Sequence, residues 1–266
     1  TAGLEYNRDR LKDNMWGYNR HTDQTVNIYS AFLQNEWKND RWGILIGGRL
    51  DKHNMVDNVI FSPRANLRFN PTRNINLRLS YSSGFRAPQA FDEDMHIENV
   101  GGTVAMIERA KDLKEEKSQS FSASADMYHR FGAFQTNLLI EGFYTRLTDV
   151  FVLGEPYDRG DGILVKTRSN GPGAKVMGLT LEGKVAYLSI LQIQAGLTLQ
   201  RSRYDEPHKW HDDAPAEKKI FRTPDTYGYF TATYTPVKPL SIALSGTYTG
   251  KMLVQRMDTV SYTHLR

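Results

Sequence analysis

His96 lies in an acidic segment whose side chains could bind a metal ion. Carboxylate oxygens are the ligands that a hard cation such as calcium prefers, and imidazole is a common metal ligand. The segment lacks the glycine spacing of an EF-hand loop, so the alternative is that the carboxylates pair with Arg86 or Arg109 or face water. For His96 itself the alternative is an ordinary solvated side chain. The acidic residues are Asp92, Glu93, Asp94 and Glu98.

A second segment with metal-binding side chains is PHKWHDDAP, residues 207–215. His208 and His211 are three residues apart and are followed by Asp212 and Asp213. Histidine and aspartate are ligands of zinc. Because no rigid element holds these side chains, we regard His96, His208 and His211 as weak metal candidates and expect no dedicated metal site.

Aromatic residues in the polar segments are better candidates for contact with a ligand. Trp16, Tyr157 and Trp210 lie in stretches that have no regular apolar pattern. Exposed aromatic side chains offer a large contact area at a small cost in conformational entropy. Together with Asp92, Asp94 and His96 they form the set of residues that we predict to bind a ligand.

No catalytic site can be assembled from the sequence. The chain has no cysteine, which excludes disulfides, thiolate nucleophiles and thiolate metal sites. The glycine pairs 47–48 and 101–102 lack the strand and helix that a phosphate-binding loop needs. We therefore expect no enzyme and no resident cofactor.

The elements that position these residues are β-strands. In 75–82, apolar Ile75, Leu77 and Leu79 alternate with polar side chains, and the same period of two runs without interruption through 191–199. This alternation is typical of a strand with one apolar and one polar face. The apolar residues of the second stretch are Leu191, Ile193, Ala195, Leu197 and Leu199.

The pattern predicts about eleven strands with short and long connections in alternation. We expect long loops at 12–24, 51–60, 86–117, 154–162 and 204–225, and one long strand at 163–187 with a bulge at 170–173. A soluble sandwich has no reason to keep all its long loops at one end. An outer-membrane barrel does, because its periplasmic turns are short and its extracellular loops long.

Composition is compatible with such a barrel. A mean hydropathy of −0.54 looks soluble, but a membrane barrel exposes apolar side chains only at alternate positions. No apolar run approaches the roughly 18 residues of a transmembrane helix. The net charge of +4 comes from basic residues scattered among 30 acidic ones, so we expect no nucleic-acid partner.

The polar faces of the strands indicate a wide, hydrated lumen. Charges of both signs in a dry core are costly unless they are paired or solvated. The predicted fold is therefore an all-β, antiparallel up-and-down transmembrane barrel that is partial, with about 11 of the roughly 22 strands of a plugged outer-membrane barrel. Among the inward-facing residues are Glu36, Arg64, Arg68, Arg78, Glu141, Glu182, Lys184 and Gln194.

The segment SYSSGFRAP, 80–88, resembles the strand-end motif of TonB-dependent outer-membrane receptors, in particular receptors of the Bacteroidetes type. Its last five residues are Gly84, Phe85, Arg86, Ala87 and Pro88. Further similarities follow in the same order as in that family. They are Pro63-Arg64, Glu116-Lys117-Ser118, NGPGAKVMGLTLE at 170–182, and Arg222-Thr223-Pro224, so that the resemblance extends from about residue 25 to residue 255.

This resemblance implies active import of a scarce chelate, namely a ferric siderophore, haem or cobalamin. The implied partners are outer-membrane lipid, the chelate, and the TonB complex, which acts through a plug domain. In haem receptors of this family a histidine follows the FRAP motif, which makes His96 a candidate axial ligand. The NPNL motif of those receptors is missing, and the nearest equivalent is 111–113.

Two other functions remain open at this stage: a passive porin, and a soluble β-sandwich binding module. We expect one partial barrel domain over 1–259 in the outer membrane of a Gram-negative bacterium, with a plug domain and further strands outside this sequence. The ending VSYTHLR, 260–266, resembles a translated adapter, and we expect it to be a non-native tail.

Overall fold

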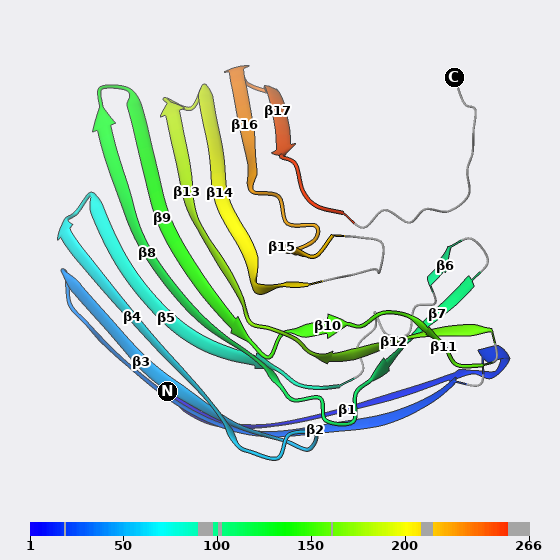
Figure 1. The fold of residues 1–266 in the computed structure, drawn as a ribbon. Helices are drawn as coiled ribbons and strands as arrows, with labels where there is room; N and C mark the ends of the chain where they lie inside the picture. Colours follow the sequence, from blue (N-terminus) through cyan, green and yellow to red (C-terminus); the bar gives the residue numbers. More distant parts are fainter. Residues whose placement is uncertain (19, 90–97, 101–102, 161, 209–214, 255–266) are drawn as a thin grey trace, which may run out of the picture.

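The computed structural model describes residues 1–18, 20–89, 98–100, 103–160, 162–208 and 215–254. Among these residues, eleven strands form the path of one antiparallel sheet (Figure 1), and β15 (Glu217–Lys219) adds to it by pairing with β14. No helix in these ranges is long and apolar enough to cross a membrane. The eleven strands are β1 (Ala2–Met15), β2 (Arg20–Lys38), β3 (Trp42–His53), β4 (Ile60–Thr72), β5 (Ile75–Arg86), β8 (Glu116–Phe131), β9 (Phe134–Thr148), β13 (Ala174–Tyr187), β14 (Leu191–His208), β16 (Thr226–Val237) and β17 (Leu240–Thr249).

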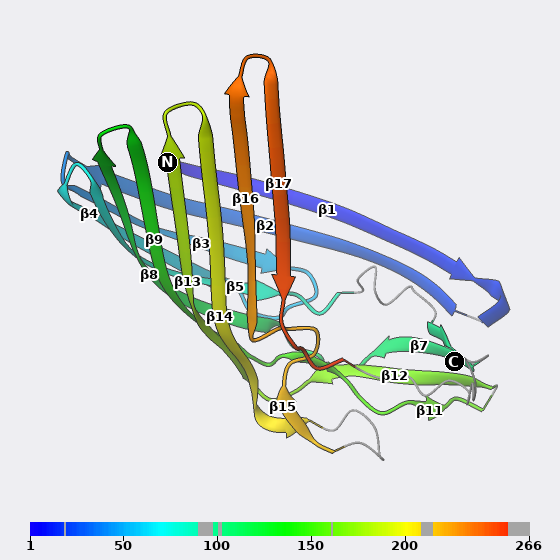
Figure 2. The same cartoon turned by 90° about the horizontal axis from the view of Figure 1, so that it is seen from above.

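The sheet is strongly curved and open. Figures 1 and 2 show a trough in which β1 and β17 form the two ends of the strand path. Within the described ranges these two strands do not pair with each other. The predicted partial, meandering barrel is therefore confirmed.

The two faces of the sheet differ in chemistry as the alternation predicts. On β14, Ile193, Leu197 and Leu199 keep 41–47% of their surface exposed on the convex face. Thr198 and Ser202, at alternate positions, are 7% and 1% exposed on the concave face. Because exposed apolar surface this extensive marks a membrane or partner surface, the convex face fits contact with lipid.

Aromatic side chains cluster where the strands meet the short turns. Trp42 and Phe69, directly opposite each other on β3 and β4, stack with ring centroids 4.2 Å apart. At the next turns Phe134 lies 5.4 Å from Phe131 and 4.8 Å from Tyr187. Amphipathic aromatic rings prefer the membrane interface, so this cluster fits an interfacial girdle.

Long connections gather at the end of the sheet opposite the short turns, as predicted (Figure 1). The predicted loop 12–24 is wrong, because β1 and β2 pair without a break from Ala2↔Leu33 to Met15↔Arg20. Only η1 (Trp16–Tyr18), a 3-10 turn, and residue 19 connect them. The backbone pairing of β1 and β2 continues beyond the apolar part of the convex face. Neither face of the hairpin needs apolar side chains there, so the alternation of apolar and polar residues that predicts a strand is absent.

Two of the other long connections form a second, smaller sheet instead of unstructured loops. It contains β6 (Glu98–Val100), β7 (Thr103–Arg109), β10 (Phe151–Leu153), β11 (Tyr157–Asp158) and β12 (Ile163–Asn170). β7 and β12 run parallel, from Val104↔Ile163 to Arg109↔Arg168. Met106 and Val165, from these two strands, are 1% and 0% exposed. Figure 2 shows this sheet beside the loop end of the main one.

The predicted single strand 163–187 is also wrong, since its halves belong to different sheets. The side chain of Asn170 holds the crossing point by accepting a hydrogen bond from the Lys114 amide at 2.8 Å and donating to the Asp149 carbonyl at 2.8 Å. A Cβ at Gly171 would lie 2.7 Å from Val152 Cγ1, and one at Gly173 would lie 2.9 Å from the Leu147 carbonyl oxygen. The glycines are needed here for close backbone approach, not for a bulge.

Candidate functional site

The motif at 84–88 attaches the second sheet to the barrel. The Arg86 guanidinium lies 5.6 Å from the ring centroid of Phe151, on β10. Ala87 is 7% exposed and packs with Val56 and Ile60, with Phe85 against the same cluster. The motif therefore has a structural role in this chain, since its side chains contact two other connections at the loop end.

Arg109, at the end of β7, connects three segments. Its Nη1 donates to the Pro88 carbonyl at 2.9 Å and to Gln24 Oε1, on β2, at 3.0 Å. Hydrogen bonds from a charged donor are stronger than neutral ones. Arg109 therefore fixes the second sheet against the inner face of the tall β1–β2 hairpin.

A cleft of about 650 Å³ opens beside this contact. One wall is the start of β2, with Arg20, His21 and Thr22, and the other is the end of β7 with the residues that follow it. Met55, Pro88 and Arg159 complete the lining from three further connections. This volume lies within the usual range of ligand sites, roughly 300–1,000 Å³.

Cationic side chains predominate in the cleft. Four of its lining residues are Lys or Arg and one, Glu108, is a carboxylate. Arg20 forms an ion pair with Asp13 at 2.7 Å, and Arg159 lies 4.0 Å from Glu108. Arg109 binds the neutral acceptors described above, and Lys111 supplies the fourth charge. A concave site lined mainly by one sign of charge attracts ligands of the opposite sign.

His53 is a buried group that sequence reasoning missed. It is 0% exposed at the end of β3. Its Nδ1 accepts a hydrogen bond from the Met55 amide at 3.0 Å, so Nε2 carries the proton and donates to Gln89 Oε1 at 3.3 Å. Burial lowers the pKa of His53, while the Gln89 bond and the charge of Asp51 oppose that shift. His53 thus links the connection 54–59 to the segment that follows Pro88.

No sequence pattern marked His53, because its neighbours are polar and its burial comes from distant segments. The sequence analysis did not identify Arg20 either, because Arg20 lies in 12–24, which was predicted to be a loop. Arg109 entered the sequence analysis only as a possible partner for acidic residues, and the structure shows that it also donates hydrogen bonds to Gln24 and to the Pro88 carbonyl.

The structure places two of the predicted ligand-binding residues near the cleft. Trp16 is 78% exposed in η1, and its ring packs edge-on against His21, a lining residue, at 4.7 Å. Tyr157 is 49% exposed on β11, two residues before Arg159. Asp92, Asp94, His96, Trp210 and His211 lie outside the described residues, so the convergence of all six stays a prediction.

The metal hypotheses stay predictions. Within the described ranges no three His, Asp or Glu side chains come together in a metal-binding group. The acidic segment 92–97, Asp212 and Asp213 lie outside those ranges, and His208 is described only as the last residue of β14.

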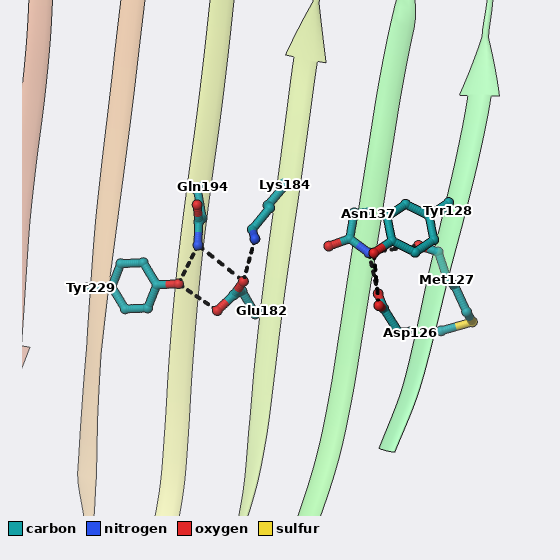
Figure 3. Close-up of polar contacts among 8 residues, drawn as sticks. All are labelled: Asp126, Met127, Tyr128, Asn137, Glu182, Lys184, Gln194 and Tyr229. Atoms are coloured by element: carbon teal, nitrogen blue, oxygen red, sulfur yellow. Dashed lines mark hydrogen bonds and ion pairs between the residues drawn. The ribbon is translucent and has the colours of Figure 1, made fainter. Parts of the chain in front are cut away.

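The concave face carries paired charges between the cleft and the short turns. In Figure 3, Glu182 on β13 accepts hydrogen bonds from Tyr229 at 2.6 Å and Gln194 at 3.1 Å, and Lys184 lies 3.1 Å away. Beside it, Asn137 donates to Asp126, which also accepts from Tyr128 at 2.9 Å. The concave face is therefore polar, as predicted, and the carboxylates of Glu182 and Asp126 are both hydrogen-bonded by neighbouring side chains.

A third group of hydrogen-bonded polar side chains lies nearer β1. Arg49 donates to Asp51 at 2.8 Å, to Glu5 at 2.9 Å and to Ser30 at 2.7 Å. Ser30 also donates to Asp51 at 2.6 Å, and Asp51 is 3% exposed. This network joins β1, β2 and β3 on the concave face.

The fold is similar to those of several solved receptors. The siderophore receptor PirA from Pseudomonas aeruginosa superposes with a TM-score of 0.69 at 18% identity, over 93% of this chain and 45% of that one. The FrpB iron transporter from Neisseria meningitidis, F3-3 variant, gives 0.61 at 17% identity over 86% and 33%. The copper transporter OprC gives 0.57 at 14% identity over 88% and 38%. This chain therefore spans less than half the length of each.

No curated protein sequence matches the chain. The family model described as "TonB dependent receptor-like, beta-barrel" matches residues 1–263, nearly the whole sequence. Members of this family are receptors and transporters of the Gram-negative outer membrane rather than enzymes. The match agrees with the open meander, the apolar convex face and the polar lumen, and the chain belongs to the TonB-dependent receptor β-barrel family.

Proposed function

We propose that the chain forms part of the barrel of an outer-membrane receptor that binds a small anionic metal chelate at its loop end and imports it. The observation that carries this proposal is the cleft, whose lining has four Lys or Arg side chains and one carboxylate. Catecholate ferric siderophores and haem carry negative charge, and cobalamin fits less well with such a lining. The solved siderophore and iron receptors of similar fold support a chelate as cargo.

The complete receptor would contain more than these strands. β1 and β17 each present an unpaired edge in the described ranges, and an unpaired backbone edge is unfavourable in a bilayer. We propose that further strands close the barrel and that a plug domain fills the lumen and couples to the TonB complex. The paired charges of the concave face would then contact the plug.

The test uses the complete receptor in outer membranes. Lys111→Glu should weaken binding of an anionic catecholate ferric siderophore by about tenfold, because it reverses a charge in the cleft. Arg73→Glu, a matched reversal at the exposed turn between β4 and β5, should leave affinity within twofold. Affinity is measured by retention of ⁵⁵Fe-labelled siderophore on membranes.

The dependence of uptake on the TonB complex distinguishes an active receptor from a passive porin. Binding should persist and uptake should cease when the TonB complex is deleted. Uptake that continues without TonB would support the porin. The soluble β-sandwich does not fit the structure, since the eleven strands form one curved sheet with an apolar outer face.

A further inference from the structure

His53 lies where two segments that line the cleft come together. It is the last residue of β3, directly opposite Ile28 on β2, and it is 0% exposed. Its Nδ1 accepts a hydrogen bond from the Met55 amide at 3.0 Å, and its Nε2 lies 3.3 Å from Gln89 Oε1. Met55 lines the cleft, and Gln89 directly follows the lining residue Pro88. One buried ring therefore holds two parts of the cleft wall.

Further contacts connect the second of these parts to a cationic group of the cleft. The Gln89 amide donates to the Ala87 carbonyl at 2.9 Å, and the Pro88 carbonyl between them accepts from Arg109 at 2.9 Å. Ala87 also packs against Val56, in the same connection as the first part. Because these contacts are continuous, a displacement of Gln89 would move a lining residue and the guanidinium bonded to it.

The two hydrogen bonds of the His53 ring require its neutral form. A second proton would lie on Nδ1, toward which the Met55 amide already directs its hydrogen. A charged imidazole is also costly in a buried site unless a partner compensates it. Burial accordingly lowers the pKa of His53. Gain of a proton therefore breaks the contact with Met55.

The charged groups on the elements around His53 give its protonated form little support. Asp51, two residues earlier on the same face, favours the protonated ring, but it is already bonded to Arg49 at 2.8 Å. Both ring nitrogens bond to neutral groups. The other four charged residues include three cations, whose fields oppose a further positive charge. The complete set is Arg49, Asp51, Lys52, Asp57, Arg86 and Arg109.

We propose that His53 is a positioning residue for the cargo: its neutral ring holds Met55 and Pro88 in the cleft wall, and gain of a proton lowers the affinity of the cleft. This inference rests on the proposed function of the cleft. Because His53 is fully buried, it acts through the two segments that it joins and does not touch the cargo. Since the folded state lowers its pKa from 6.5, affinity should be fully present above pH 6.5 and fall as the pH drops below that value.

A positive charge on His53 would have the opposite effect if only its field mattered, because it would attract an anionic cargo. The cleft already has four Lys or Arg side chains, so one more charge changes its field modestly, whereas loss of the link displaces lining residues. His21, which lines the cleft, can likewise gain a proton, and a charge there would strengthen binding of an anion. The sign of the pH dependence therefore distinguishes positioning from charge.

The experiment measures the Kd of a ⁵⁵Fe-labelled catecholate siderophore on outer membranes that contain the complete receptor, at pH 7.5 and pH 5.5. In the wild type Kd should rise severalfold in acid, because one proton coupled to binding changes Kd by at most about tenfold per pH unit. His53→Gln has no titrating ring but keeps a donor and an acceptor, so it should bind within about threefold of the wild type at pH 7.5 and lose the acid effect. His53→Leu lacks both bonds and should bind weakly at both pH values.

Two histidine controls isolate the effect of His53. His21→Gln should keep the acid loss, because it removes a charge that would oppose that loss. His129→Gln, at the exposed short-turn end, should behave like the wild type. Receptor abundance in the outer membrane and the thermal midpoint of unfolding at pH 7.5 show whether each variant is folded.

The inference is overturned if His53→Gln keeps the acid loss of the wild type, or if the wild type binds more tightly at pH 5.5 than at pH 7.5. Lys111→Glu, measured at pH 7.5, tests the cleft separately. If Lys111→Glu weakens binding as expected while His53→Gln keeps the acid loss, only the role of His53 is refuted. If Lys111→Glu binds like the wild type, the cleft is not the cargo site and both proposals fail.

Discussion

The Tyr229 hydroxyl donates a hydrogen bond of 2.6 Å to Glu182 Oε2, passing across Gly196 on the strand between them. Tyr229 and Glu182 are each directly opposite Gly196, on β16 and β13 respectively. A Cβ at Gly196 would lie 2.6 Å from the Tyr229 ring. The absence of a side chain therefore allows the tyrosine to reach across β14 (Figure 3).

Gly196→Ala should destabilise the barrel by about 1–3 kcal/mol, the usual cost of overpacking. The added methyl group would displace the Tyr229 ring and break its bond to Glu182. Gly183→Ala is the control, because a Cβ there meets nothing within 4 Å. Urea unfolding in detergent measures the difference, and equal stabilities for the two variants would contradict the prediction.

The link that His53 forms between the connection 54–59 and the segment after Pro88 should weaken at acidic pH. Because the pKa of His53 is lowered in the folded state from its ordinary value of 6.5, the folded state favours the neutral ring. Its stabilising effect is therefore fully present above pH 6.5 and is lost as pH falls below that value. Protonated Nδ1 can no longer accept the bond from the Met55 amide.

Hydrogen exchange of the peptide containing Met55 measures this effect, with rates corrected for the intrinsic pH dependence. Protection should fall between pH 7 and pH 5 in the wild type and be independent of pH in His53→Leu. His129→Leu, at the exposed short-turn end, should behave like the wild type. Protection that stays constant in the wild type would contradict the role of His53.

Gly171→Ala should detach the second sheet from the barrel. The new Cβ would lie 2.7 Å from Val152 Cγ1 and would separate the start of β13 from β10. We expect faster limited proteolysis within residues 150–170, and little change in the unfolding of the main sheet. At Gly154 an added Cβ makes ordinary contact at 3.5 Å, so Gly154→Ala should be cut at the wild-type rate.

Substitutions of Trp16 and of His96 should affect growth differently, depending on which cargo the receptor imports. If the cargo is haem, His96→Ala in the complete receptor should cause the largest loss of growth on that cargo, since an axial ligand binds the iron directly. If the cargo is a siderophore, Trp16→Ala should weaken growth more than His96→Ala does. Growth on each iron source is compared at equal receptor abundance in the outer membrane. The prediction would be contradicted if, on a siderophore, His96→Ala weakened growth and Trp16→Ala did not.

The strands of the main sheet and the chemistry of its two faces could be predicted from the sequence alone. Period-two alternation in 75–82 and 191–199 is a local property, because neighbouring side chains of a strand point to opposite faces. The short turns and the position of the motif at 84–88 follow from local residue types too. For these reasons the meander, the apolar convex face and the end at which loops gather could all be predicted.

The pairing and contacts of the long connections could not be predicted from the sequence, because they depend on how the chain folds. The pairing of β7 with β12 joins residues almost sixty positions apart. Residues 103–109 were predicted to lie in a loop, and 163–170 were predicted to be a strand that continues into 174–187 rather than the partner of 103–109. The buried His53 bonds to Gln89, 36 positions away, and Arg109 binds Gln24 from 85 positions away. Such contacts depend on long-range packing, which the local pattern of side chains does not encode.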